Sequence, residues 1–291
     1  IFGKMKIYNC AHCEFAFSYP EPKEKTLNDY YKNVYRDIGR PHFYNETSKL
    51  IISEKNISYL SYLSNIVNIE KIKNVFDIGS GSGEFGFLLK NKFKNVELFC
   101  SEIDKFSIKH LELREHKNYE NIDTIDKKFD LLVSLHSFEH FPNINIFFEI
   151  LDKIIEKKGY LFFEVPNCPF NESFDRRPYD SPHLLFFTKK SLEIIFKKKG
   201  YKILDIVEFG PSLNSVFKDM ENFKKEFENW TPEKKLKSGL VNMIKRLLPK
   251  NVKKLIKMLF VNTNKSFEKI EDYTNKNELG WAIRGIVQKI D

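Results

Sequence analysis

One short segment limits the fold of this chain more than any other, and it runs Val75-Phe-Asp-Ile-Gly-Ser-Gly-Ser-Gly-Glu-Phe-Gly86. An apolar run typical of a buried strand leads into closely spaced glycines, and a helical pattern begins directly after them. Glycine lets the backbone turn sharply and approach a ligand, while the start of a helix offers free N–H groups. A strand, a glycine loop and a helix in this order predict a βαβ unit with a ligand-binding turn.

The pattern beyond this segment continues with short apolar runs separated by helical stretches, which predicts a doubly wound, mostly parallel sheet in an α/β fold. We expect strands at Val75–Ile78, Val96–Cys100, Tyr119–Ile122, Phe129–Leu135, Tyr160–Val165, Lys202–Glu208 and Trp281–Gln288. Helices are expected at Glu84–Lys94, Ile144–Lys157 and Lys189–Lys199. A further helix should precede the core, because apolar residues recur at helical spacing from Ser48 to Ile69.

The chain divides into four segments by composition. Residues 1–47 form a polar, Tyr-rich lead-in and lid, and residues 48–210 form the core. Residues 211–278 form a basic helical insertion, in which the stretches 240–248 and 252–259 predict two amphipathic helices with lysine and arginine on the outer face. Residues 279–291 return to the core as its final strand.

The charge and the cysteine content limit the class of protein to which this chain can belong. The formal net charge of +8 suits an anionic partner, but the basic residues gather in the insertion without interleaved aromatic side chains, so nucleic acid is not expected. The four cysteines suggest reduced thiols rather than a disulfide framework. The start of the chain lacks a signal-peptide pattern, and no apolar run is long enough to span a bilayer, so we expect a cytoplasmic protein.

Two acidic residues limit the class of ligand that this loop can bind. Asp77 lies inside the glycine motif, where it would repel a pyrophosphate but attract an ammonium group. Glu102 follows the second strand, where a carboxylate can accept both hydroxyl protons of a ribose. With these acids, the segment resembles the class I S-adenosylmethionine-dependent methyltransferases. A nicotinamide or flavin enzyme is the alternative, because Gly81-x-Gly83-x-x-Gly86 is also a dinucleotide fingerprint.

The resemblance extends through the stretches 129–141, 159–167 and 182–201 and resumes at Gly280. It implies a Rossmann-like, seven-stranded sheet whose last strand is antiparallel and inserted between the fifth and sixth. It also implies S-adenosylmethionine as cofactor and S-adenosylhomocysteine as product. The cofactor-binding residues that it indicates are Asp77, Gly79, Gly81, Gly83, Glu102, Ile103, Ile122, His136 and Tyr31.

Candidate catalytic residues follow the fourth predicted strand, at the sheet edge where open α/β sheets bind ligands. His136, Glu139 and His140 are the candidate bases, and His183 is a further candidate in the acceptor pocket. The alternative to a catalytic role is that these residues only cap helices or are polar groups of the surface. In ubiquinone-pathway O-methyltransferases, which are similar here, a Glu-x-x-Glu-His stretch helps to hold a divalent cation. In sugar-modifying relatives a comparable Glu-His pair acts in acid–base roles, and we expect that metal-free role here.

The lead-in carries Cys10-x-x-Cys13, which resembles the second half of a zinc ribbon found before some of these methyltransferases. The first cysteine pair is missing, and a structural zinc ion needs four ligands, so we expect two free thiols. Tyr30, Tyr31 and Tyr35 are expected to belong to the lid over the cofactor.

The resemblance implies a small-molecule methyltransferase. The expected reaction is O-methylation of a sugar, or of a nucleotide-linked or phosphorylated intermediate of surface-glycan assembly. N-methylation of an amino sugar and a non-catalytic membrane-surface module remain as alternatives. The insertion is expected to cap the acceptor pocket with positive charge, and a homodimer or peripheral membrane contact is the alternative use of its apolar faces.

Overall fold

The computed structural model describes residues 2, 4–35, 54–169, 183–212 and 280–290. The chain divides into two compact units, one formed by residues 1–210 with 279–291 and the other by residues 211–278. The helices and lysines that the sequence places in the insertion lie outside the described residues, as do residues 48–53 of the helix expected before the core.

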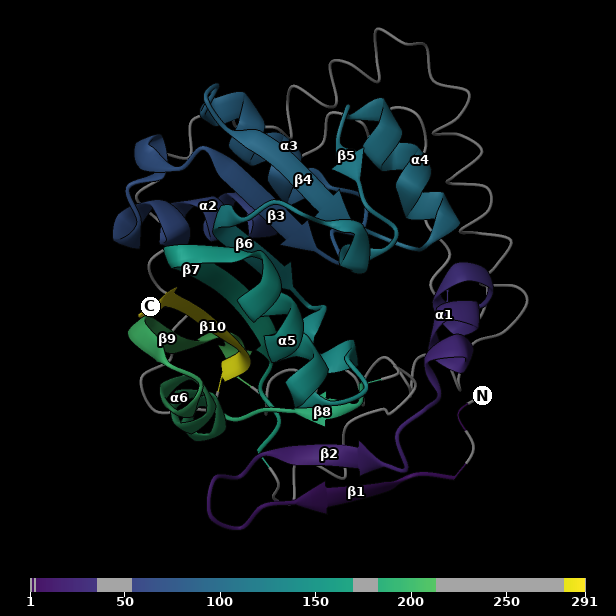
Figure 1. The fold of residues 1–291 in the computed structure, drawn as a ribbon. Coiled ribbons are helices and arrows are strands. Elements are labelled where there is room, and N and C mark those ends of the chain that lie inside the picture. Colours follow the sequence, from purple (N-terminus) through teal and green to yellow (C-terminus); the bar gives the residue numbers. More distant parts are fainter. Residues whose placement is uncertain (1, 3, 36–53, 170–182, 213–279, 291) are drawn as a thin grey trace, which may run out of the picture. The chain divides into compact units, whose positions relative to one another are not determined.

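The main sheet contains seven strands in the order β5-β4-β3-β6-β7-β10-β9 (Figure 1). The pairs from β5 to β7 are parallel, whereas β10 is antiparallel to β7, with Ala282 opposite Pro166 and Gln288 opposite Tyr160. The strands are β3 Asn74–Ile78, β4 Glu97–Ser101, β5 Lys117–Asn118, β6 Phe129–Leu135, β7 Ile155–Pro166, β9 Tyr201–Ser212 and β10 Gly280–Lys289. The predicted fold class is confirmed, including the place of the last strand.

Helices cover both faces of this sheet because successive strand residues point to opposite sides. On β3, Val75 packs with Leu63 of α2 (Glu54–Ile66) and Leu89 of α3 (Glu84–Lys92). On the opposite face, Phe76 belongs to a cluster that includes Phe147 of α5 (Ile144–Ile154) and Leu192 of α6 (Lys189–Lys198). The helix α4 (Lys105–Leu113) follows β4.

Several predicted boundaries differ from the structure by one to five residues, among them the following three. The weak strand expected at Tyr119–Ile122 lies earlier, as β5, and Ile122 instead begins a short 3-10 helix, η3 (Ile122–Thr124). The helix expected to reach Lys157 ends at Ile154, because Ile155 already pairs with Phe129 of β6. The helix before the core ends at Ile66 rather than Ile69. In the second case, strand pairing overrides a helical pattern, which sequence periodicity cannot anticipate.

The lead-in forms structure that the sequence analysis did not predict. Strands β1 (Lys6–Asn9) and β2 (Ala16–Tyr19) make an antiparallel hairpin, and β2 also pairs with β8 (Leu185–Phe186). Helix α1 (Glu24–Asn33) follows. The strands are too short for a clear alternation, and their pairing with β8 is long-range. The hairpin ties the lead-in to the segment that carries His183.

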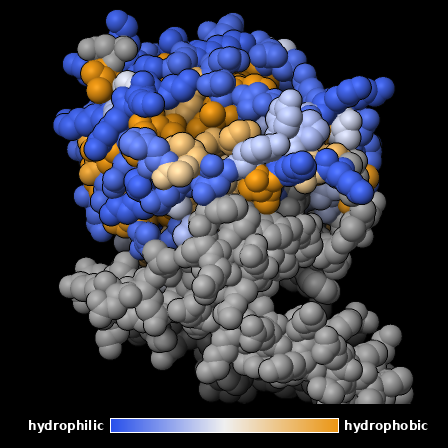
Figure 2. Space-filling view, turned by 90° about the horizontal axis from the view of Figure 1, so that it is seen from below, coloured by the Kyte–Doolittle hydropathy of each residue, from blue (hydrophilic) through white to orange (hydrophobic). Residues whose placement is uncertain are grey.

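None of the helices described is long and apolar enough to cross a bilayer. Figure 2 shows one face on which hydrophilic side chains predominate and hydrophobic ones reach the surface in patches.

Candidate active site

The glycine loop connects β3 to α3 and adopts a backbone that side chains would disturb. Gly79 has a φ of 66°, and a Cβ there would lie 2.6 Å from Cβ of Ser137. Gly83 has a φ of 73° and caps α3, and its Cβ would lie 2.5 Å from the His116 ring. Left-handed φ and close approach both favour glycine. The loop can therefore pass close to the end of β6 and stay open toward a ligand.

Glu102, directly after β4, holds the loop from the side. Its carboxylate accepts hydrogen bonds from the backbone N–H groups of Gly81, Ile103 and Asp104, at 2.8, 2.8 and 2.9 Å. A carboxylate offers about four acceptor positions, so three backbone donors leave capacity for a ligand hydroxyl. Burial raises the pKa of Glu102, and the backbone hydrogen bonds oppose that rise.

Asp77 lies at the end of β3 and is 4% exposed. Burial, and then the neighbouring charge of Glu102, raise its pKa to about 7. An ionised Asp77 is therefore poorly stabilised by the protein itself, and a cationic ligand group would supply the missing charge.

An open cleft of about 1300 Å³ lies over these residues. Among the residues predicted to bind the cofactor, Gly83 does not line it and packs against His116 instead. The predicted residues that line the cleft are Asp77, Gly79, Gly81, Glu102, Ile103, Ile122, His136 and Tyr31. His140 lines it as well, whereas Glu139 and His183 do not.

His136 follows β6 with a φ of 56°, which is uncommon for a non-glycine residue and recurs at functional sites. Its Nε2 lies 2.9 Å from Oε1 of Glu164, and its Nδ1 lies 3.4 Å from Oε1 of Glu139. Burial favours the neutral ring, but the contacts with Glu139 and Glu164 outweigh it and raise the pKa of His136. His136 is therefore held by two buried carboxylates.

The residues that hold Glu164 were not predicted from the sequence. Arg284 of β10 donates from Nε to Oε2 of Glu164 at 2.8 Å, and its Nη1 donates to Ser58 Oγ. Tyr59 donates its hydroxyl to Glu164 at 2.7 Å, and Lys55 lies 3.2 Å from the same carboxylate. The available signal was a single charged residue in each of the two predicted apolar runs, 160–165 and 281–288. Burial alone would raise the pKa of Glu164, but the hydrogen bond with His136 and the charges of Arg284 and Lys55 lower it.

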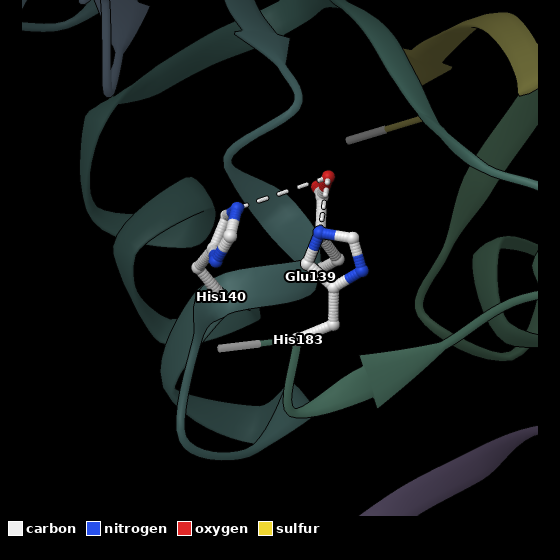
Figure 3. Close-up of side chains that lie close together, drawn as sticks. All are labelled: Glu139, His140 and His183. Atoms are coloured by element: carbon white, nitrogen blue, oxygen red, sulfur yellow. Dashed lines mark ion pairs between the residues drawn. The ribbon is translucent and has the colours of Figure 1, made fainter. Parts of the chain in front are cut away.

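Glu139, His140 and His183 come together beside His136. Glu139 and His140 belong to the short 3-10 helix η4 (Phe138–His140), and His183 precedes β8. The Nε2 atoms of His140 and His183 each lie 3.9 Å from Oε1 of Glu139 (Figure 3). Burial alone would raise the pKa of Glu139, but the three histidines lower it to about 2. Tyr31 of α1 contacts Nδ1 of His140 at 2.9 Å, so the lead-in reaches this cluster.

The sheet with its antiparallel strand β10, the glycine loop and the acidic residues beside it define a class I S-adenosylmethionine-dependent methyltransferase. The chain belongs to the family described as "Methyltransferase domain", whose model matches residues 49–206, more than half of the chain. S-adenosylmethionine is its cofactor, and the predicted enzyme class is confirmed.

Among known proteins, malonyl-[acyl-carrier protein] O-methyltransferase 2 of Ilyobacter polytropus is 29% identical over 102 residues, which cover 32% of this chain and 39% of that protein. A Galdieria sulphuraria structure, assigned provisionally as a sarcosine dimethylglycine methyltransferase, is 15% identical with a TM-score of 0.50, covering 81% of this chain and 85% of its own. A methyltransferase from Archaeoglobus fulgidus has 18% identity and a TM-score of 0.49, covering 85% and 100%. The chain thus spans about two fifths of its curated relative.

Replacing Glu102 by alanine should weaken S-adenosylhomocysteine binding by about 1–3 kcal/mol, because the variant loses charge-assisted hydrogen bonds to the ribose and to the loop. Calorimetry measures the change. Glu97→Ala, on the exposed start of β4, serves as the matched control and should bind normally. If the Glu102 variant bound S-adenosylhomocysteine with unchanged affinity, Glu102 would not be a cofactor-binding residue.

Cofactor affinity should also depend on pH through Asp77. Its pKa of about 7 means that the free protein holds a proton there in mild acid, and an ammonium group pairs with the ionised form. Binding then requires loss of that proton, so affinity should fall roughly tenfold per pH unit below the pKa and level off above it. Titration calorimetry from about pH 8 to about pH 5 tests this. Asp77→Asn should flatten the profile, and a flat wild-type profile would contradict the pairing.

Proposed function

We propose that this chain transfers the methyl group of S-adenosylmethionine to a hydroxyl group of a small polar acceptor, namely a sugar or a nucleotide-linked or phosphorylated intermediate of surface-glycan assembly. The observation that carries the proposal is the cluster of Glu139, His140 and His183 beside the cleft, next to the glycine loop. Methyl transfer to a hydroxyl needs a proton acceptor as well as alignment, whereas a preformed neutral amine needs alignment alone.

The proposed reaction is an in-line displacement. The acceptor oxygen attacks the methyl carbon as the carbon–sulfur bond breaks, and the electron pair of that bond stays on the sulfur of S-adenosylhomocysteine. The hydroxyl proton passes to the histidine–glutamate cluster, where His140 lines the cleft and Glu139 lies beneath it. Glu102 holds the ribose, and Asp77 holds the amino group of the cofactor.

The charge of the cleft favours a second candidate. Its described lining carries more carboxylates than lysines, with Glu21, Glu24 and Glu149 near Lys32 and Lys153. This lining would attract a cationic acceptor, as in N-methylation of an amino sugar, rather than a phosphate. The lysines expected to bring positive charge to the acceptor pocket belong to residues 211–278, most of which lie outside the described residues. We propose that this segment caps the acceptor site, and a contact between two subunits or with a membrane is the alternative.

A methyl-transfer assay with labelled S-adenosylmethionine tests both candidates. The acceptor panel contains nucleotide sugars with an uncharged sugar group, amino sugars and, because of the named relative, a malonyl-loaded acyl-carrier protein. Label in an alkali-stable ether of a sugar supports the proposal. Label on nitrogen selects the second candidate, and label only in a methyl ester of the carrier protein would replace both.

We also propose that the reaction takes place in the cytoplasm, since all four cysteines are free thiols. Cys100 and Cys168 are buried, and Cys10 is exposed at the end of β1 next to Cys13. A count of reactive thiols on the protein as isolated from cells tests this placement, and a disulfide found there would argue for an oxidising compartment.

A further inference from the structure

The carboxylate of Glu139 lies in unusual surroundings. The side chain is 1% exposed, and neither oxygen has a hydrogen-bond partner among the described residues. The imidazole nitrogens around Oε1 lie at 3.4 Å for His136 and at 3.9 Å for His140 and His183. These separations exceed those of good hydrogen bonds. A buried carboxylate without short polar contacts is costly, so something that fits between these atoms would stabilise the site.

Three of these side chains have the geometry of a ligand set. Glu139, His140 and His183 each offer one ligand atom, and these atoms all lie within 4.8 Å of one another. Figure 3 shows a nitrogen of each imidazole, His140 and His183, directed at the carboxylate of Glu139. Metal–ligand distances near 2.0–2.1 Å place ligand atoms roughly 3.3 Å apart, so the two glutamate–histidine pairs would need to close by roughly half an ångström and the most widely spaced ligand atoms by up to about 1.5 Å.

The backbone and the surrounding side chains keep this set in place. Leu184 donates its N–H to the carbonyl oxygen of Glu139 at 2.9 Å, which fixes the segment of His183 against η4. Tyr31 contacts Nδ1 of His140 and leaves Nε2 directed at Glu139. Metal-binding histidines commonly have their second ring nitrogen held in this way. His136 is a poorer ligand, because Glu164 occupies its Nε2 at 2.9 Å.

We propose that Glu139, His140 and His183 bind one divalent transition-metal ion of the zinc class, with its remaining coordination positions open for a substrate oxygen. Two imidazoles and one carboxylate suit zinc or a similar ion better than magnesium, which prefers oxygen ligands. The third ligand is 43 positions beyond His140 in the chain, as the numbering shows, so only the fold brings the set together.

The catalytic use of the ion rests on the proposed function. A hydroxyl bound at the open position would become more acidic, because the cation stabilises the oxyanion. Because Glu139, His140 and His183 would then be ligands, the proton would pass to solvent rather than to the cluster, and the oxygen would attack the methyl carbon as the carbon–sulfur bond breaks. No electron is transferred, so the step needs no oxidant or reductant.

Zinc titration of the full chain tests the site directly, in a Cys10→Ser/Cys13→Ser background so that the exposed thiols do not compete. We expect one saturable zinc site by calorimetry, and His183→Ala should weaken it at least tenfold. His110→Ala, which removes a histidine from α4, should leave it unchanged. Unaltered zinc affinity in the His183 variant, or no saturable site in the parent, would overturn the proposal.

Each variant is also titrated with S-adenosylhomocysteine to show that it is folded. If His183→Ala fails this test, His140→Ala takes its place with the same expected loss of zinc affinity. Methyl transfer is then measured with and without a chelator, which separates the two hypotheses. Methylation of a hydroxyl without zinc binding would refute the metal site and keep the function. Zinc binding without any methylated hydroxyl would keep the metal site and refute the proposed function.

Discussion

Glu139→Gln is expected to lower kcat by about 10²- to 10⁴-fold, the range found when a group that handles the transferred proton is removed. Glutamine keeps the shape of the side chain but removes the charge toward which His136, His140 and His183 are directed. The effect should follow whether the carboxylate works with the imidazoles alone or through a bound cation. Steady-state kinetics with the acceptor found in the panel measure it.

A loss of folding could imitate this result, so S-adenosylhomocysteine affinity is measured in the same preparation and should change little. Glu112→Gln, an exposed residue of α4 that does not line the cleft, is the matched control and should keep nearly full activity. Full activity in the Glu139 variant would exclude the cluster from proton transfer and would favour an acceptor that needs alignment only.

Arg284→Met is expected to destabilise the protein by about 3–5 kcal/mol, because the substitution leaves a buried carboxylate without its cation. Arg284 is 1% exposed, and its Nη2 lies 2.7 Å from Oε2 of Glu164. The guanidinium also packs over the rings of Phe209 and Tyr59, at 3.8 and 4.6 Å from their centroids. Urea unfolding measures the free-energy change through the shift of the midpoint at constant slope.

The double variant Arg284→Met/Glu164→Gln separates lost packing from buried charge. Removing the uncompensated carboxylate should restore part of the stability, since the two effects are coupled through one contact. A double variant that is less stable by the full sum of both single changes would show that the ion pair itself contributes little.

Much of the fold could be predicted from sequence because the signals are local. The apolar run of β6 at Phe129–Leu135 matched the structure at both ends, and the glycine segment predicted the β3–α3 turn. The β1–β2 hairpin could not be predicted in this way. Its four-residue strands are stabilised by β8, more than 160 positions later, and no local pattern encodes such a pairing.

The residues of the candidate site also differ in how far local sequence predicts them. Asp77 and Glu102 follow buried strands, so their position at the sheet edge could be inferred from sequence. Glu164 and Arg284 lie within strands that read as apolar, and their importance depends on the antiparallel pairing of β10 with β7, which places them opposite each other. The contact of His183 with Glu139 likewise depends on the backbone bond of Leu184, which no spacing rule gives.

A crystal structure of the wild-type chain with S-adenosylhomocysteine tests the account most directly. We predict that both ribose hydroxyls bind Glu102, that the amino group lies at Asp77, and that the sulfur points toward the cluster of Glu139, His140 and His183. A product molecule whose ribose lies away from Glu102, or whose sulfur faces away from that cluster, would contradict the account.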